Sequence, residues 1–458
     1  MMITFHSLRA LPLLLAMAFG AGSAAAQSTA SPYQTSKLDN GLDVVVIESG
    51  SVPLTTIAIA VRNGAFTEPD EYAGLSHLYE HMFFKANTAI PSQEGFMKRV
   101  RELGIVFNGY TSEEVVVYLF TLPSKNLEPG MKFMADAITS PLFKEEELVR
   151  EREVVLGEFD RNEAQPTFVL SRAIDSAMWM PYVSRKQPLG QRQVIKTATV
   201  QKMQMIKERF YHPGNSALIV SGDVKTEQVN ALAKKYLGDW KRGPNPFPAY
   251  APPPFPQLVS KLVIREAKIP DTYVRLHFRG PSLAKDDPDT YIAHLLITLL
   301  NQPTSRFYHN LIDSGLVTSA SGNYDNAGNA GTIDFYLRSP KEKTEQALET
   351  LREEIRAMAR PGYFTSEEVE IAKGIAADQQ LFARDNFHSF TIGVTAQWWS
   401  MASLGYYLDF DNNVMHVTPE QLRSFVERYM IGKPFILGVG AERPVLDQLK
   451  ITEEALRW

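Results

Sequence analysis

The sequence predicts two duplicated α+β domains, because strand patterns alternate with helical patterns and because motifs of the first half recur in the second. Alternating apolar residues at 42–47 and 55–61 are typical of strands, and helical patterns follow them. Three motifs recur at an offset of 219 or 221 residues: Pro69-Asp70-x-Tyr72 as Pro288-Asp289-x-Tyr291, Glu208-Arg209-Phe210 as Glu427-Arg428-Tyr429, and Phe143-x-x-Glu146-Glu147 as Phe364-x-x-Glu367-Glu368. A period of this length exceeds any solenoid unit and indicates duplication of a whole domain.

The elements of the first half follow one another without long gaps. After the two strands we expect a helix around residues 77–81, and then further elements: a helix at 92–103, strand at 107–122, helices at 127–162 with a break near 140–141, more helices to 209, a strand at 217–222 and a helix to 236. Residues 243–257 hold seven of the 28 prolines, which is typical of an extended linker. The predicted domains are therefore residues 33–242 and 258–458.

Composition limits the compartment and the chemistry. The 458 residues carry a formal net charge of -5 without a long basic run, so nucleic acid is not an expected partner. Arg9, the apolar run 10–19 and three alanines before Gln27 predict a signal peptide at residues 1–26 and a periplasmic mature protein without stable membrane insertion. The alternative is an uncleaved anchor, for which the apolar run is short. The chain has no cysteine, which favours a catalytic metal held by His, Asp or Glu over a structural zinc.

The stretch His-Leu-Tyr-Glu-His at residues 77–81 carries the candidate chemistry. On a helix its two histidines and its glutamate share one face, which is the arrangement that a catalytic zinc needs. We predict that Thr67 caps this helix and that Pro69 lies in its first turn. The alternative is a chance match on an amphipathic helix, which is expected in roughly one chain in a hundred of this kind.

The second half lacks this polar set. At the offset of 219, leucines at 296, 299 and 300 replace the two histidines and the glutamate. Because buried polar groups must find partners, this asymmetry indicates a working site in the first half and a structural copy in the second.

A zinc hydrolase needs a third protein ligand, and a glutamate-rich helical region is the candidate source. Glu147, Glu151 and Glu158 lie on one stripe of the predicted helix, and the spacing alone does not choose among them. For any single one of them, the alternative is an ordinary solvated acidic side chain that pairs with Arg150 or Arg152.

Residues 74–85, Gly-Leu-Ser-His-Leu-Tyr-Glu-His-Met-Phe-Phe-Lys, resemble the inverzincin metallopeptidases of the pitrilysin and mitochondrial processing peptidase family, as does Glu-Arg-x-Val-Val-x-x-Glu at 151–158. The resemblance spans essentially the whole mature chain and is to the short, half-size members. It implies that His77, His81 and Glu158 hold one Zn²⁺ per chain, that Glu80 is the catalytic base and that Glu151 supports the site without binding the metal. It also implies that each domain is an antiparallel sheet packed with helices.

The resemblance extends to residues that bind substrate in the family. Asn108, within Phe-Asn-Gly-Tyr-Thr at 107–111, matches an edge strand of the pattern Asn-Ala-x-Thr, with Gly109 in place of the alanine. An ordinary edge-strand asparagine is the alternative. Arg306 matches the arginine of a substrate-binding Arg/Tyr pair, whereas Thr318 stands at the tyrosine position. The resemblance therefore implies a peptide substrate and a homologous partner subunit that carries an Arg/Tyr pair, and we expect a heterodimer, with a homodimer as the alternative.

Together these observations predict a periplasmic zinc endopeptidase acting on peptides or unfolded segments, with residues 258–458 as its inactive structural repeat. Two other functions stay open. The chain could bind peptides without cleaving them, or it could serve as an assembly subunit of a larger complex.

Overall fold

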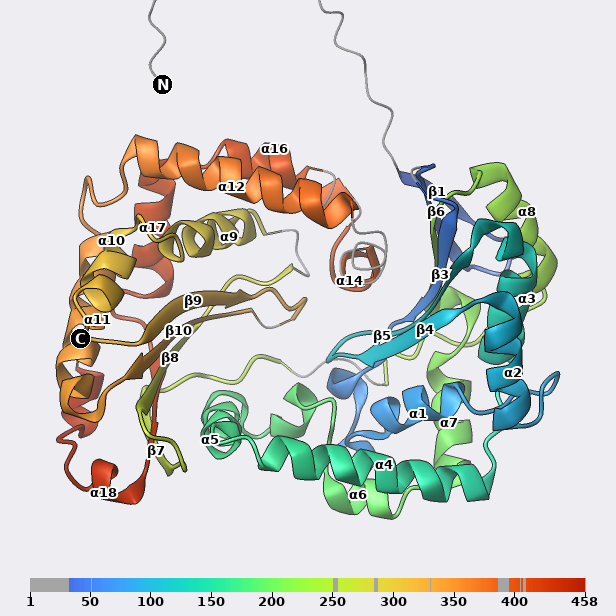
Figure 1. The fold of residues 1–458 in the computed structure, drawn as a ribbon, viewed down its shortest axis with the longest axis horizontal. Coiled ribbons are helices and arrows are strands. Elements are labelled where there is room, and N and C mark those ends of the chain that lie inside the picture. The colour runs from blue at the N-terminus through green and yellow to red at the C-terminus, as the bar shows by residue number, and fades with distance from the viewer. Residues whose placement is uncertain are drawn as a thin grey trace, which may run out of the picture. The chain divides into compact units, whose positions relative to one another are not determined.

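The computed structural model describes residues 33–50, 52–249, 254–283, 287–329, 331–385, 395–403, 405–406 and 409–457 (Figure 1). The predicted signal peptide and residues 250–253 of the predicted linker lie outside this part of the chain. Residues Tyr33–Trp458 form one unit. Among the described residues, no helix has both the length and the apolar character needed to span a lipid bilayer.

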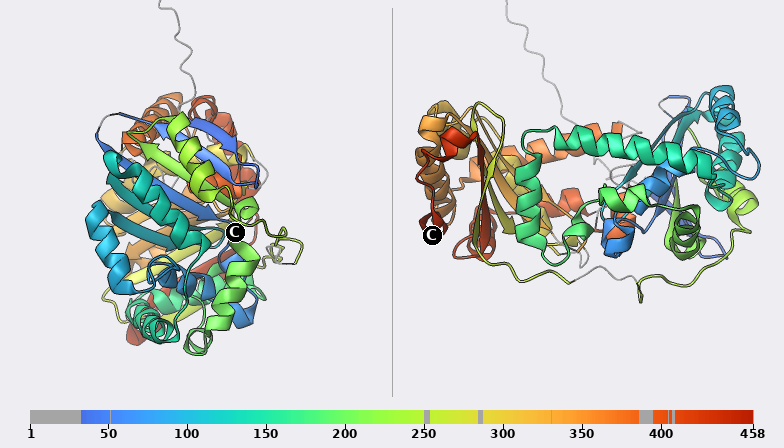
Figure 2. Two further views of the ribbon diagram at one scale, coloured as in Figure 1. Left: turned by 90° about the vertical axis from the view of Figure 1, so that its right-hand side faces the viewer. Right: turned by 90° about the horizontal axis from the view of Figure 1, so that it is seen from below.

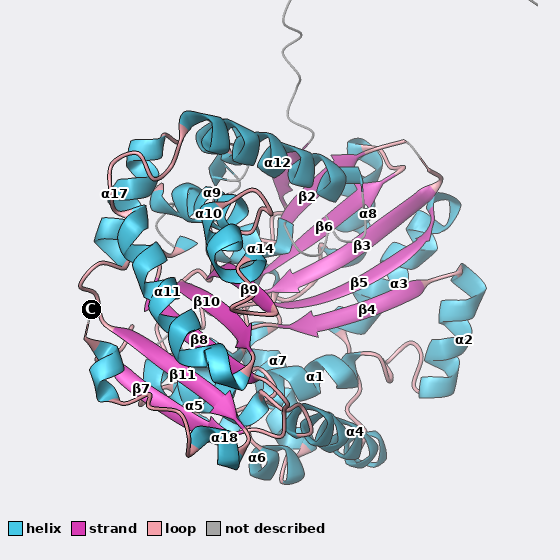
Figure 3. Ribbon diagram, turned by 60° about the vertical axis from the view of Figure 1, so that its left-hand side comes forward, coloured by secondary structure: helices cyan, strands magenta, loops and turns pink. Residues whose placement is uncertain are grey.

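The first sheet has six strands in the order β1-β2-β6-β3-β5-β4 (Figure 3). Their bounds are Tyr33–Lys37 for β1, Asp43–Glu48 for β2, Leu54–Val61 for β3, Val106–Thr111 for β4, Val116–Pro123 for β5 and Ser216–Gly222 for β6. Neighbouring strands are antiparallel, except that β2 and β6 run parallel. The central strand β6 is buried along its whole length, which explains its unbroken small and apolar sequence. Strand β4 forms one edge of the sheet.

Helices α3 and α8 lie over one face of this sheet (Figure 2). Helix α1 packs against β4 and β5, and α4 packs against α1. The helices of this half are α1 (Leu75–Phe83), α2 (Gln93–Leu103), α3 (Leu127–Thr139), α4 (Glu145–Glu163), α5 (Phe168–Trp179), α6 (Arg192–Lys196), α7 (Val200–Phe210) and α8 (Thr226–Leu237). The predicted break near 140–141 therefore separates α3 from α4, and the predicted strand region 107–122 is the β4–β5 hairpin.

Within the described residues, the second sheet repeats this arrangement without a counterpart of β1. Its strand order is β7-β11-β8-β10-β9, and the parallel pair β7 with β11 corresponds to β2 with β6. The bounds are Lys261–Glu266 for β7, Thr272–Arg279 for β8, Ser319–Asp325 for β9, Thr332–Ser339 for β10 and Phe435–Ala441 for β11. Strand β11 begins 219 residues after β6, as the repeated motifs predict. The predicted fold class, a duplicated α+β fold with mainly antiparallel sheets, is confirmed.

The second half also shows what replaces the polar set of the first. Its described helices are α9 (Asp289–Leu300), α10 (Arg306–Tyr308), α11 (Thr344–Met358), α12 (Ser366–Asp385), α14 (Ala396–Met401), α16 (Phe410–Met415), α17 (Pro419–Tyr429) and α18 (Arg443–Leu446). Leu296, Leu299 and Leu300 of α9 are buried in the hydrophobic core of this half. At these positions the second copy therefore has packing residues.

Helix α1 begins later than the sequence predicts. Two short 3-10 turns, Ala65–Thr67 and Asp70–Tyr72, come before it, and the helix starts only at Leu75. The hydroxyl of Thr67 donates to the Gly64 carbonyl at 2.8 Å instead of accepting an amide of α1, so the predicted cap is wrong. The residues after Thr67 have the sequence pattern of a helix start. They form short turns instead, because the chain bends before α1 begins.

Candidate metal centre

The start of α1 is fixed by a buried carboxylate and by a glycine. Glu68 accepts the N–H groups of Gly74 at 2.7 Å and Ser76 at 2.6 Å, so it satisfies amides at the positive end of the helix. Gly74 has φ of 96°, and a Cβ there would lie 2.5 Å from the carbonyl oxygen of Leu189. Only glycine fits this bend without strain. The bend and its carboxylate cap therefore set where the polar face of α1 lies.

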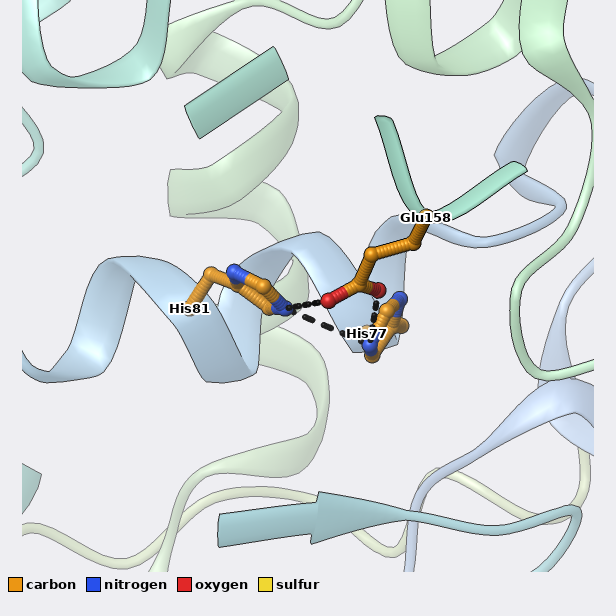
Figure 4. Close-up of side chains that lie close together, drawn as sticks. All are labelled: His77, His81 and Glu158. Carbon is orange, nitrogen blue, oxygen red and sulfur yellow. Dashed lines mark hydrogen bonds and ion pairs between the residues drawn. The ribbon is translucent and has the colours of Figure 1, made fainter. Parts of the chain in front are cut away.

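Three predicted ligand side chains converge between α1 and α4 (Figure 4). His77 and His81 come from successive turns of α1, and Glu158 comes from α4. The Nε2 atoms of the two histidines are 3.3 Å apart. Oε2 of Glu158 lies 3.5 Å from Nε2 of His77, and Oε1 of Glu158 lies 3.8 Å from Nε2 of His81. One donor atom of each residue thus lies within 4.8 Å of the other two.

These separations fit a tetrahedral cation. Two ligand atoms at zinc bonding distance are about 3.3 Å apart when the geometry is tetrahedral. The two ring nitrogens match this value, and each of them lies 3.5–3.8 Å from an oxygen of the Glu158 carboxylate. Two imidazole nitrogens and one carboxylate form the donor set of a catalytic zinc, which leaves a position free for water.

The position of Glu151 indicates which ring nitrogen of His81 can bind a metal ion. Its Oε2 lies 3.1 Å from Nδ1 of His81, and its Oε1 lies 2.6 Å from Nζ of Lys85. A hydrogen on Nδ1 that is donated to Glu151 leaves the Nε2 lone pair directed at His77 and Glu158. The sequence reasoning gave Lys85 no role, although its position four residues after His81 places it near the same helix face.

The two histidines differ in their protonation. Burial, together with the charge of His81, lowers the pKa of His77 to about 3, so its ring is neutral at neutral pH. Burial also acts to lower the pKa of His81, but its hydrogen bond to Glu151 and the nearby carboxylates outweigh burial and raise it. Burial acts to raise the pKa of Glu151, while its hydrogen bonds to His81 and Lys85 produce a net lowering. Glu151 therefore stays ionised beside His81.

Glu80 lies between the two histidines in the sequence, and its side chain faces β4. Its side chain is buried, with 8% of the residue exposed, and Thr111 of β4 donates its hydroxyl to Oε2 at 2.9 Å. Burial raises the pKa of Glu80, an effect that His81 and Thr111 partly offset. A carboxyl whose pKa is shifted upward is suited to both accept and return a proton near neutral pH. The sequence reasoning noticed Thr111 within its motif but assigned it no part in the site.

The predicted substrate-binding residues lie on other elements. Asn108 is exposed on the edge strand β4, where its Oδ1 accepts the Gly109 N–H at 2.9 Å. Arg306 is exposed at the start of α10, with its guanidinium 5.2 Å from the centroid of the Tyr363 ring. The Thr318 hydroxyl donates to the Arg338 carbonyl at 3.1 Å. Among the described residues, no hydrogen bond or ion pair joins Arg306 to the three predicted ligands, so the roles of Asn108 and Arg306 stay predictions.

Two family models match the chain. Residues 44–190 match the model described as Insulinase (Peptidase family M16), and residues 197–375 match the Peptidase M16 inactive domain. The chain belongs to peptidase family M16. The first of these M16 matches contains all the side chains of the candidate metal centre, and the predicted family resemblance is confirmed.

Individual relatives and a solved structure also support membership of family M16. An uncharacterized zinc protease from Rickettsia felis is 24% identical over 329 residues, which cover 71% of this chain and 78% of that protein. The mitochondrial-processing peptidase subunit beta from Neurospora crassa is 27% identical over 308 residues, 65% of this chain and 58% of the relative. The crystal structure of the periplasmic protease PqqL from Escherichia coli has the same fold, with a TM-score of 0.78 and 18% identity over 93% of this chain and 49% of PqqL.

Proposed function

We propose that this M16 chain is a zinc-dependent endopeptidase that hydrolyses peptides or unfolded segments. The observation that carries the proposal is the convergence of His77, His81 and Glu158 on one point, with the carboxylate of Glu80 on the same helix face. In this assignment the first three side chains hold one Zn²⁺. The relatives that are named zinc proteases support the same assignment.

Each residue then has a defined part in hydrolysis. A zinc ion held by His77, His81 and Glu158 would supply Lewis acidity for the scissile carbonyl and would lower the pKa of a water molecule. Glu80 accepts the proton of the attacking water and later returns it to the leaving amine. Glu151 keeps His81 in the tautomer whose Nε2 faces the ligand cluster, and Lys85 keeps Glu151 in place through its ammonium group.

We assign peptide binding to the outer edge of β4, which is the last strand of the described sheet. An extended peptide can add to an unpaired strand edge through main-chain hydrogen bonds, and β4 pairs only with β5 in the described sheet. The same strand contacts Glu80 through Thr111, so a peptide on this edge would pass close to the base. On the family resemblance, we assign Asn108 on this strand and Arg306 in the second half to substrate binding.

We further propose that the mature protein works in the periplasm with a homologous subunit. The predicted signal peptide and the likeness to periplasmic PqqL support the compartment. Thr318 in place of tyrosine supports a partner that contributes an Arg/Tyr pair, and one relative is named as a subunit. A homodimer is the alternative.

Cleavage of a quenched fluorescent peptide mixture tests the activity. We expect cleavage by the purified protein that is lost with a chelator, and a fall of at least about 100-fold in Glu80→Gln while bound zinc stays near one per chain. Glu71→Gln, an exposed carboxylate that precedes α1, is the matched control and should retain activity. Bound zinc without cleavage would instead support a peptide-binding or assembly subunit, and no bound zinc would overturn the ligand assignment.

A further inference from the structure

The carboxylate of Glu80 rests on two residues of β4 that share one strand face. Thr111 donates its hydroxyl to Oε2 at 2.9 Å. Gly109, two residues earlier, has no side chain, and a Cβ built there would lie 2.8 Å from Oε1 of Glu80 and 3.1 Å from its Cδ and Cγ. Since alternate residues of a strand project to the same face, these two positions form a single surface beneath the carboxylate.

The two contacts restrain different oxygens. The hydroxyl of Thr111 fixes Oε2, while the open space at Gly109 lets Oε1 approach the strand backbone. Together they define both the depth of the side chain and the rotation of the carboxylate about its last bond. Glu80 is attached to α1, so the opposite strand provides restraint that the helix alone cannot give.

We propose that Gly109 and Thr111 are positioning residues that set the carboxylate of Glu80 for proton transfer. The inference rests on the proposed peptidase function and extends it to two residues outside the ligand set. A general base must lie within hydrogen-bonding reach of the proton that it accepts, and a displacement of about 1 Å can cost on the order of 100-fold in rate. The resemblance places alanine where this chain has Gly109, whereas here the Glu80 carboxylate lies close to the position that a Cβ would take.

Replacing the hydroxyl tests the first contact. We expect Thr111→Val to lower kcat by roughly 10- to 100-fold with KM and bound zinc unchanged, whereas Thr111→Ser, which keeps the hydroxyl, should recover most of the rate. Thr121→Val is the matched control, because Thr121 also makes a hydroxyl contact on the same sheet, with Thr56 at 2.8 Å. A rise in KM instead of a fall in kcat would overturn the proposal and assign Thr111 to substrate binding.

Adding a methyl group tests the second contact. Gly109→Ala should also lower kcat, and in a Glu80→Gln background neither Gly109→Ala nor Thr111→Val should lower the residual rate further, because both act through the same carboxylate. An additional loss in that background would show that these residues act elsewhere, and would overturn the proposal.

Two readouts do not depend on turnover. The metal-free Thr111→Val and Gly109→Ala proteins should bind a labelled extended peptide within about twofold of the parent, because the substrate edge of β4 is intact. Crystal structures of the same metal-free variants should show the Glu80 carboxylate displaced from β4. An undisplaced carboxylate would overturn the positioning role even if the parent protein were found to be inactive, so this failure is distinct from failure of the proposed function.

Discussion

Oε2 of Glu151 lies 3.1 Å from Nδ1 of His81, so a carboxylate outside the predicted ligand set orients one of the ligands. The same carboxylate is held by Lys85 at 2.6 Å through its other oxygen. Both of its oxygens are thus engaged, and its negative charge stabilises any positive charge that develops on the imidazole. This relationship leads to the first two predictions.

Glu151→Gln should weaken zinc binding by about 10- to 100-fold, because the amide lacks the negative charge that orients His81 and that pairs with Lys85. Competition with a fluorescent chelator measures this change. Glu153→Gln, which alters an exposed glutamate on the same helix, should leave the zinc affinity unchanged. Equal losses in both variants would mean that the general negative potential of α4 matters and that the contact with His81 does not.

Zinc affinity should rise with pH and then level off above the pKa of His81. In the metal-free protein this pKa lies above its ordinary value, so a proton must leave His81 before the ring can bind the ion. His77, with a pKa of about 3, is already neutral and releases none. Below the pKa of His81 the affinity should therefore fall about tenfold for each pH unit. At a pH below the pKa of His81, calorimetry in buffers of different ionisation enthalpy should count one released proton, and a count of two would contradict this assignment.

The contribution of Glu68 to stability should decrease as pH rises. Burial raises the pKa of Glu68 to about 7, and its hydrogen bonds from Gly74 and Ser76 oppose this only in part. A carboxyl whose pKa is higher in the folded than in the unfolded chain favours folding when protonated, and this advantage is lost between about pH 4.5 and pH 7. The free energy of unfolding of the metal-free protein should therefore change by about 3 kcal/mol relative to Glu68→Gln across this range, in favour of the glutamine variant at high pH. A constant difference across pH would show that Glu68 stays ionised in the folded protein.

Gly74→Ala should destabilise the metal-free protein by on the order of 2–4 kcal/mol, because the new Cβ meets the Leu189 carbonyl and the backbone has positive φ. Gly157→Ala is the control within α4. A Cβ at Gly157 would meet nothing within 4 Å, and alanine there should stabilise the helix by about 0.5–1 kcal/mol. Urea unfolding of both variants gives the comparison, and similar values for the two would contradict the argument from backbone geometry.

The sequence predicts the duplicated fold and the polar face of α1 well, because both depend on patterns within single elements or on spacings that recur. The choice of Glu158 among three glutamates came from family resemblance, since the helical spacing puts all three on one stripe. The structure brings Glu158 to the histidines and Glu151 to the far side of His81. The predicted ligand side chains therefore lie together, while their roles, those of Glu80, Glu151, Asn108 and Arg306, and the metal itself stay proposals.

What the sequence did not predict depends on contacts between distant segments. The start of α1 was placed too early because Thr67 and Pro69 are favourable for a helix start, and nothing local reveals that Glu68 provides the cap across a bend at Gly74. Likewise, the contact of Thr111 with Glu80 joins a strand to a helix 31 residues away. Such contacts follow from the packing of β4 against α1, which no periodicity in either element specifies.

The separation of the predicted ligands along the chain has a consequence for the stability of the protein. His81 and Glu158 are 77 residues apart, so an ion shared by them would close a long loop in the same way as a covalent cross-link. This chain has no cysteine and cannot use disulfides for that purpose. A bound ion would then also stabilise the fold, and the metal-free protein should be the form that heat and added proteases open first, between α1 and α4.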